Sequence, residues 1–181
     1  MSYQLCYYGN PILREKAKDV TSFSDELATL ARDMVTTMRE ESGIGLAGPQ
    51  IGKLLRIFVM EIPPDMDVDA AGERLNPGLD GPLVVVNPHI ETPEDDTDEM
   101  EEGCLSIPDV RGRVERPYEI ILTYQTVTGE EKSLHLKGLA ARCAQHELDH
   151  LNGVLFLDHL GSVKKMAIKN KLKKIKQTYS S

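Results

Sequence analysis

Residues 145–153 read QHELDHLNG, and this short stretch determines how the rest of the chain is interpreted. In a helix, side chains four residues apart lie on one face, so His146 and His150 can direct ring nitrogens at one metal ion. Glu147 then stands beside that ion as a base for metal-assisted hydrolysis without being a ligand. A chance match on a surface helix is the competing interpretation, and the small number of histidines, five in the chain, disfavours it.

Two histidines hold a metal incompletely, so a third ligand must come from elsewhere in the chain. The third histidine of the metzincin pattern is replaced by Phe156, and no glutamate follows the HELDH segment to act as in other zincins. Asp158 and His159 remain as weak candidates. Cys104 is the strongest, because a thiolate binds transition metals well.

The other two cysteines have poorer contexts for metal binding. Cys6 lies near the N-terminus, and Cys143 lies three residues before His146 on the same helix face. We therefore expect Cys143 to pack beside the site rather than to bind the ion.

A Cys/His/His set leaves one coordination position open for water, whose pKa the ion lowers. Hydrolysis through a tetrahedral intermediate also needs hydrogen-bond donors for the oxyanion. Two candidates are the side chain of Gln50, in the glycine-rich stretch 43–52, and the backbone N–H of Leu105. The glycines make 43–52 a loop or an irregular strand that other groups can approach closely.

Length and composition indicate the number of domains and the class of protein that carries this site. The chain has 181 residues, 20.2 kDa and 40% apolar residues, which predicts one domain with a substantial core. Its apolar runs are too short for a membrane helix, and its first residues resemble no signal or transit peptide. The three cysteines form no CxxC pair, which suits a reducing compartment. We therefore expect a cytoplasmic protein without membrane contact.

The net charge of −8 is unevenly distributed along the chain. Residues 164–181 carry seven lysines and no acid, so the rest of the chain carries −15. This argues against general nucleic-acid binding by the body. For the tail, a solvated amphipathic end and a contact with ribosomal RNA both remain open. Eight acids fall within residues 91–102, and we expect a solvated loop there.

The hydrophobic pattern predicts an α+β fold, with antiparallel or mixed sheets packed around the helix that carries HELDH. One helix is expected from Ser24 to about residue 42, with an apolar stripe toward the core. The proline-rich stretch 63–82 is expected as an exposed excursion between neighbouring strands. Further expected elements are strands at 55–62, 83–86, 119–127 and 132–136, a helix at 139–151, and a C-terminal helix with Val163, Met166, Ala167 and Ile175 on its apolar side.

Three motifs in this order, GIGLAGPQIG (43–52), EGCLSIP (102–108) and QHELDHLNG (145–153), resemble the three signature motifs of the peptide deformylase family. The match extends to NPILREKAKDV near the N-terminus and to the VERP segment, so it covers nearly the whole chain. The resemblance implies a catalytic domain at 1–163 followed by a basic helix or tail at 164–181.

That resemblance also implies a reaction and a ligand set. The expected reaction removes the formyl group from the N-terminal formylmethionine of nascent proteins and releases formate. Cys104, His146 and His150 would hold one metal ion, usually Fe2+, with Zn2+, Ni2+ or Co2+ as substitutes. Glu147 would be the general acid/base. Gln50 and the Leu105 amide would stabilise the oxyanion.

Substrate contacts are expected around the same site. Leu139 and Cys143 share the helix face of His146 and would line an apolar pocket that takes the methionine side chain, although core packing alone also explains them. Ile44 and Gly45 would offer backbone groups to an extended nascent peptide. Some deformylases are similar in using a C-terminal helix at the ribosome, so the expected partners are nascent formylated polypeptides and the ribosome. We expect a monomer.

Two features are left open by the motifs. The family commonly has Ala-Ala where this chain has Ala47 and Gly48, and the missing methyl is expected to loosen the loop that carries Gln50. Glu102 either forms an ion pair with Arg111 or is solvated.

The rival functions are a zinc endopeptidase, which lacks its third ligand here, and a binding module with a structural metal site, which leaves Glu147 and Gln50 unexplained.

Overall fold

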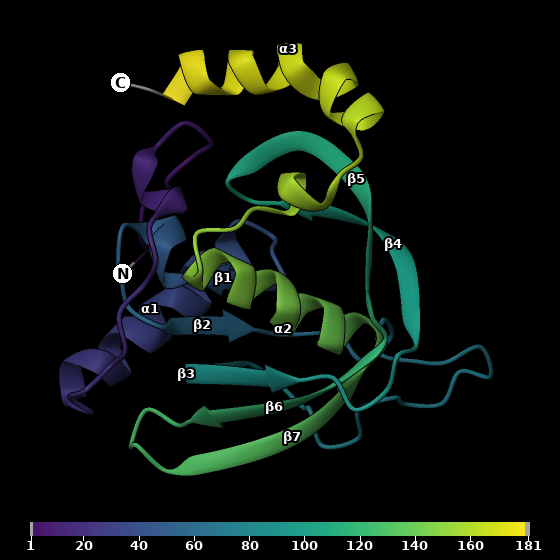
Figure 1. The fold of residues 1–181 in the computed structure, drawn as a ribbon. Helices are drawn as coiled ribbons and strands as arrows, with labels where there is room; N and C mark the ends of the chain where they lie inside the picture. The colour runs from purple at the N-terminus through teal and green to yellow at the C-terminus, as the bar shows by residue number, and fades with distance from the viewer. Residues whose placement is uncertain (1, 180–181) are drawn as a thin grey trace.

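A five-stranded sheet between two helices carries most of the hydrophobic core (Figure 1). In the computed structural model, which describes residues 2–179, its strands run in the order β1-β2-β3-β6-β7 and every neighbouring pair is antiparallel. The strands are β1 (Gly45–Ala47), β2 (Ile57–Met60), β3 (Leu83–Glu91), β6 (Glu119–Gln125) and β7 (Glu131–Lys137). The predicted α+β class is confirmed.

Alternation along the central strands places one helix on each face of this sheet. In β2, Phe58 and Met60 pack toward α2, whereas Ile57 and Val59 pack toward α1. The α-helices are α1 (Asp25–Glu40), α2 (Gly138–Leu151) and α3 (Ser162–Tyr179). The HELDH helix is therefore central, as predicted, with its alanine-rich side on the sheet.

A second, two-stranded sheet consists of β4 (Thr97–Cys104) and β5 (Ile107–Pro117), which curve over the other side of α2 (Figure 1). The sequence predicted a solvated loop at residues 91–102. Most of these residues are exposed, as predicted, but a loop is wrong for residues 97–102, which belong to β4. Several of its acids are held by arginines from elsewhere in the chain: Asp98 by Arg142, and Glu99 by Arg113. Neutralised by these partners, an acid-rich segment can form a strand.

The excursion at 63–82 connects β2 to β3, and these two strands are neighbours in the sheet as predicted. The excursion is exposed over most of its length but is anchored by the buried side chains of Asp67 and Asn76. Its polar attachments lie within the excursion and reach Lys137, and Leu79 adds an apolar contact with the main core.

The C-terminal helix α3 lies across β5 (Figure 1). Its buried residues are Ile168 and Ile175, which join the cluster around Ile107, Val110 and Val114. The predicted apolar side is therefore correct at Ile175 and wrong at Val163, Met166 and Ala167, which are exposed. Among residues 2–179, no helix has both the length and the apolar character needed to cross a membrane.

This packing predicts that α3 contributes to the stability of the rest of the fold. Ile168→Ala should lower the free energy of unfolding by about 2–4 kcal/mol, because it removes buried methyl groups from the cluster on β5. Met166→Ala is the matched control, since Met166 is 75% exposed, and it should change stability by less than about 0.5 kcal/mol. Denaturant unfolding of both variants measures the difference, and equal losses would show that α3 is not packed in this way.

Candidate active site

Helix α2 turns one face to the sheet and the other to a cavity. Ala140, Ala141 and Ala144 are fully buried against the sheet, which lets the helix lie close to it. The helix ends at Leu151, and Gly153 follows with φ +72°, a conformation that favours glycine. His146 and Glu147 line the cavity, and His150 lies beneath it, one turn farther along.

Three donor atoms meet beside this helix. The donor atoms of Cys104, His146 and His150 lie within 4.8 Å of one another, and Cys104 Sγ is 3.2 Å from His150 Nε2. Zinc–ligand distances are about 2.0–2.3 Å, so donor atoms this close together are spaced on the scale of one shared ion. A thiolate and two imidazoles are donors that suit iron and zinc. The residues therefore fit a single transition-metal ion.

The alternative ligands have other partners. Asp158 accepts hydrogen bonds from Arg14, and His159 Nε2 lies 2.8 Å from Asp149 Oδ2. Phe156 is buried in the α3-side cluster and lies against the His146 ring, with a centroid separation of 6.1 Å. These positions are outside the donor group formed around Cys104.

The other two cysteines also lie outside that group. The Cys143 thiol donates a hydrogen bond to the carbonyl oxygen of Ile44. Burial raises the pKa of Cys143, and the neighbouring Glu147 raises it further, so a neutral thiol is favoured. The pKa of Cys6 is raised by burial as well.

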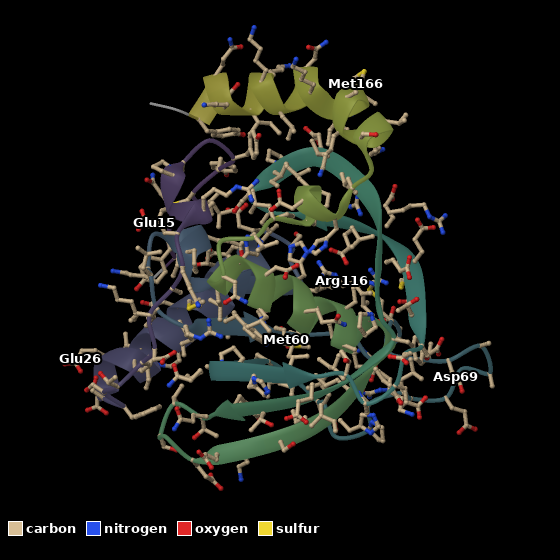
Figure 2. The ribbon with its side chains drawn as sticks, viewed as in Figure 1. Glu15, Glu26, Met60, Asp69, Arg116 and Met166 are labelled. Atoms are coloured by element: carbon tan, nitrogen blue, oxygen red, sulfur yellow. The ribbon has the colours of Figure 1, made fainter. Side chains whose placement is uncertain are left out.

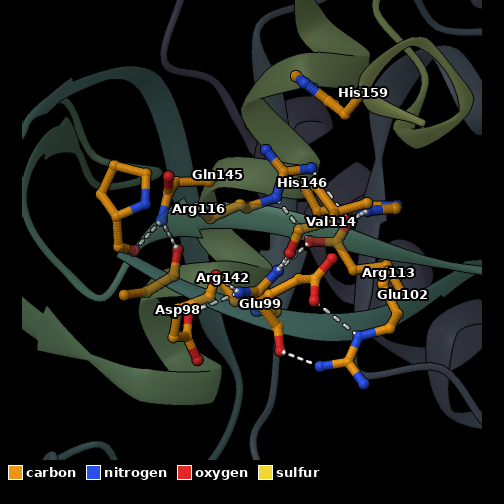
Figure 3. Close-up of polar contacts among 12 residues, drawn as sticks. Asp98, Glu99, Glu102, Arg113, Val114, Arg116, Arg142, Gln145, His146 and His159 are labelled. Atoms are coloured by element: carbon orange, nitrogen blue, oxygen red, sulfur yellow. Dashed lines mark hydrogen bonds and ion pairs between the residues drawn. The ribbon is translucent and has the colours of Figure 1, made fainter. Parts of the chain in front are cut away.

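Glu102 is the centre of a buried polar network (Figure 3). Its carboxylate accepts hydrogen bonds from Arg116 at 2.6 and 3.0 Å and from Arg142 Nη1 at 2.8 Å. It also lies 2.9 Å from His146 Nδ1. Burial alone would raise the pKa of Glu102, but the hydrogen bonds from His146 and Arg116 lower it strongly. The group is an anion and can only accept, so His146 Nδ1 must carry the proton.

This network predisposes the two imidazoles to bind a metal. Because Glu102 holds the proton on Nδ1, His146 can exchange its Nε2 proton for a metal ion and present the Nε2 lone pair to it. The pKa of His150 is lowered, first by burial and then by the positive charge of His146, so its ring is neutral. Its Nδ1 is buried without a hydrogen-bond partner among the described residues.

The pKa of His146 shows that its environment favours an attached positive charge. Burial alone would lower this pKa, but the contacts with Cys104 and Glu102 raise it well above its ordinary value. A metal cation at Nε2 would occupy the place that a proton otherwise takes.

Glu147 lies beside the donor group and, in the part of the chain that the structure describes, forms no hydrogen bond to an arginine. Its Oε2 is buried and has no partner among the residues that the structure describes. Burial raises its pKa to about 7, the charge of His146 acting in the opposite direction. A carboxyl group with a pKa near neutrality can both accept and donate a proton.

The predicted oxyanion donors lie beside Cys104. Gln50 is buried; its Oε1 accepts from the Ala47 N–H at 2.8 Å, and its Nε2 donates to Ser106 Oγ at 3.2 Å. The same Nε2 is 3.5 Å from Cys104 Sγ. Gln50 and Leu105 both line the cavity.

The cavity has a volume of about 530 Å³ and brings together most of the residues predicted from sequence. Ile44, Gly45, Leu139 and Cys143 line it together with Gln50, Cys104, Leu105, His146 and Glu147. Gly45 has no room for a side chain, because a Cβ there would collide with Glu147 Oε1 and lie 2.9 Å from Cys143 Sγ. His150 contributes to the donor group from below the cavity wall.

Sequence reasoning missed the residues that orient the site. Arg116 and Arg142 hold Glu102, and Asp149 holds Arg116 from the other side at 2.9 Å. Neither alternative left open for Glu102 is correct: the residue is buried rather than solvated, and its partners are Arg116 and Arg142 rather than Arg111, which lies opposite Gly103. One available signal was the spacing of Arg142, four residues before His146 and hence on the same helix face.

The structure also revises the interpretation of Gly48. A Cβ at this position would lie 2.6 Å from the Lys53 carbonyl oxygen and 2.8 Å from the Leu55 carbonyl oxygen. The following backbone therefore occupies the space of the expected methyl group. The loop that carries Gln50 is tightly packed here rather than loosened.

Comparisons with known proteins agree on one family. The sequence model of the polypeptide deformylase family matches residues 2–166. A peptide deformylase of Opitutus terrae is 43% identical over 173 residues, covering 93% of this chain and 90% of the relative. A peptide deformylase of Thermotoga maritima is 38% identical over 176 residues, covering 97% of this chain and 98% of the relative.

Solved structures show the same relationship. The crystal structure of peptide deformylase from Ehrlichia chaffeensis superposes with a TM-score of 0.86 at 32% identity, covering 98% of each chain. A Plasmodium falciparum peptide deformylase structure gives a TM-score of 0.84 at 34% identity, covering 98% of this chain and 97% of its own.

The close packing at Gly48 yields a prediction that reverses the sequence-based expectation. Gly48→Ala should destabilise the protein by about 1–3 kcal/mol, because the added methyl group must displace backbone carbonyls. Gly161→Ala is the control, since a Cβ there meets nothing within 4 Å. Thermal unfolding of both variants provides the measurement. A Gly48→Ala variant as stable as the parent would show that residues 53–55 can move away freely.

Proposed function

Because this chain belongs to the peptide deformylase family, whose members remove the formyl group from the N-terminal methionine of nascent proteins, we propose that the cavity beside α2 is its catalytic site. The observation that carries this proposal is the meeting of three donor atoms, from Cys104, His146 and His150, within 4.8 Å of one another and next to the buried carboxyl of Glu147. The enzyme is a metal-dependent amide hydrolase.

We propose that Cys104, His146 and His150 hold the metal ion, with Fe2+ as the native ion and Zn2+, Ni2+ or Co2+ as substitutes. When bound, such an ion supplies Lewis-acid chemistry and lowers the pKa of water toward neutrality. Glu102 orients His146 for this role through the Nδ1 hydrogen bond.

Glu147 is proposed as the proton carrier. Hydrolysis adds water to the formyl carbon and breaks the bond from that carbon to the methionine nitrogen. Glu147 takes a proton from the attacking water and delivers it to the departing nitrogen, so a free amine and formic acid leave, and the acid then ionises to formate. Its pKa of about 7, raised by burial, suits both halves of this transfer near neutral pH.

Gln50 and the Leu105 backbone N–H are proposed as donors to the oxygen on which negative charge develops. The Gln50 amide is held on both sides, by the Ala47 N–H and by Ser106. Such fixed donors need little reorganisation during the reaction, which is the source of their effect.

Substrate binding is proposed along β1, which is an edge strand of the five-stranded sheet. Ile44 and Gly45 would pair with the extended peptide backbone through the edge that β2 does not use. Leu139 and Cys143 would contact the methionine side chain in the apolar part of the cavity.

The test of this function is formate release from a formyl-Met peptide by anaerobically purified enzyme, with its metal content measured. Glu147→Gln should lower kcat at least about 100-fold while the metal content stays near that of the parent, because the carboxyl is a proton carrier and not a ligand. Glu40→Gln, on the exposed end of α1, is the matched control and should retain full activity.

Two outcomes would contradict the mechanism. Full activity in Glu147→Gln would remove its catalytic role. A parent enzyme that binds Fe2+ but releases no formate would favour a purely structural metal site.

We further propose a monomer that works in the cytoplasm and meets nascent chains at the ribosome through α3. The ribosome contact rests on the seven lysines in residues 164–181, a segment that contains no acid. Lys165 and Lys171 donate to backbone carbonyls of the body, and Lys176 lies against Gly9. Deleting the helix is a poor test, because Ile168 and Ile175 are part of the core.

A charge variant tests the ribosome contact more cleanly. Changing Lys164, Lys169, Lys173 and Lys174 to Gln removes exposed charges without touching the buried residues of α3. Co-sedimentation with ribosomes at low salt should weaken by about tenfold, because fewer phosphates are neutralised. Thermal unfolding checks that the fold is intact. Unchanged co-sedimentation would assign the lysines to an ordinary solvated face.

A further inference from the structure

The catalytic cavity extends beyond the groups that the reaction needs, and its outer part is lined by exposed methionines. Met66 is 52% exposed and Met100 is 38% exposed, and both line the same cavity of about 530 Å³. They are two of the five large apolar side chains that are exposed among the described residues. Their shared position indicates a ligand-facing wall rather than scattered surface residues.

Met66 belongs to the excursion between β2 and β3, and the residue after it fixes its position. Asp67 is buried; its carboxylate accepts hydrogen bonds from Arg74 Nε at 3.1 Å and from the Asn76 backbone N–H at 3.2 Å. It also accepts from the Asn76 side chain. These hydrogen bonds join the two ends of the segment 67–76 immediately after Met66.

Asn76 in turn attaches the excursion to the start of α2. Its side chain accepts from the Lys137 N–H at 2.9 Å and donates to the Lys137 carbonyl at 3.1 Å. The helix begins at the next residue and carries Leu139 and His146. Figure 2 shows Asp69, in the excursion, on the side of the molecule where α2 begins. Met66 is thus held at a fixed place relative to the catalytic helix.

The excursion also starts beside the strand that is proposed to bind substrate. The backbone N–H of Glu61 donates to the Ile44 carbonyl at 2.9 Å, just before the excursion leaves the sheet. A peptide that pairs with the free edge of β1 at Ile44 and Gly45 then continues along the cavity in which Met66 lies. With the methionine side chain placed beside Leu139 and Cys143, the side chains that follow it would be the ones nearest this wall.

We propose that Met66 is a specificity-determining residue that contacts apolar side chains at the first or second position after the formylmethionine. This inference rests on the proposed function and extends it to a further part of the substrate. Methionine is suited to the role because its flexible, polarisable side chain adapts to apolar groups of different shapes. Nascent proteins present just such variety after their first residue.

The test compares three formylated peptides: formyl-Met-Ala-Ala and the two peptides with Leu replacing either Ala. The measured quantity is the ratio of kcat/KM for each Leu peptide to kcat/KM for the Ala peptide. In the parent enzyme this ratio should exceed one at the contacted position. In Met66→Ser it should fall about fivefold there, as expected for losing an apolar contact that buries half of a methionine side chain.

Two further variants separate a contact from a general effect. Met66→Leu keeps an apolar side chain and should restore most of the ratio. Met166→Ser is the matched control, because Met166 is an exposed methionine on α3 that does not line the cavity, and its ratio should equal that of the parent.

The inference is overturned if Met66→Ser leaves both ratios unchanged, or if it lowers kcat/KM equally for all three peptides. A parent enzyme that releases no formate from any of the peptides would overturn the proposed function itself, and this inference with it. The two failures are therefore distinguishable.

Discussion

The buried carboxylate of Glu102 is the constraint on which the site depends. An isolated carboxylate in a protein interior is strongly disfavoured, so its partners must be in place whenever the chain is folded. Those partners come from β5 and α2: Arg116, Arg142 and His146. Since Asp98 and Asp149 also engage the two arginines, the charges of the network are largely balanced. One buried anion thereby joins β4, β5 and α2 and fixes the proton on His146 Nδ1.

The sequence predicted those parts of the site that depend on local geometry or on donor chemistry. The two histidines of α2 follow from helical spacing, and Cys104 follows from the affinity of a thiolate for transition metals. The support of these ligands could not be predicted in the same way. Asp98 and Arg142 lie 44 residues apart in sequence. Strand pairing places Glu102 opposite Gly112, so its contact with Arg116 does not follow from the β4–β5 register either. An acid-rich stretch has the same composition whether solvent or distant arginines neutralise it.

The fold was predictable where apolar residues alternate regularly along a strand. It was less predictable in α3, where apolar residues occur on more than one side of the helix. The antiparallel strands and the α+β class were expected from alternating apolar residues. In α3 the choice of buried face was mostly wrong, because Val163 and Met166 precede the segment that reaches β5, whereas Ile168 and Ile175 lie over it. The need for glycine at two positions was equally hard to predict. Glu147 leaves no space for a side chain at Gly45, and the backbone of residues 53–55 leaves none at Gly48. Both contacts exist only in the folded chain.

The cavity is consequently a product of nearly the whole chain. Ile107 and Val110 line it on one side and pack on their other side against Ile168 and Ile175 of α3. The excursion reaches it from β2 and is fastened to the residue that precedes α2. A segment that supports the cavity wall in this way cannot be an independent appendage, even where its outer face has a separate role. Substitutions of the exposed lysines of α3 should therefore leave the cavity intact, whereas substitutions of Ile168 or Ile175 should disturb the proposed catalytic site.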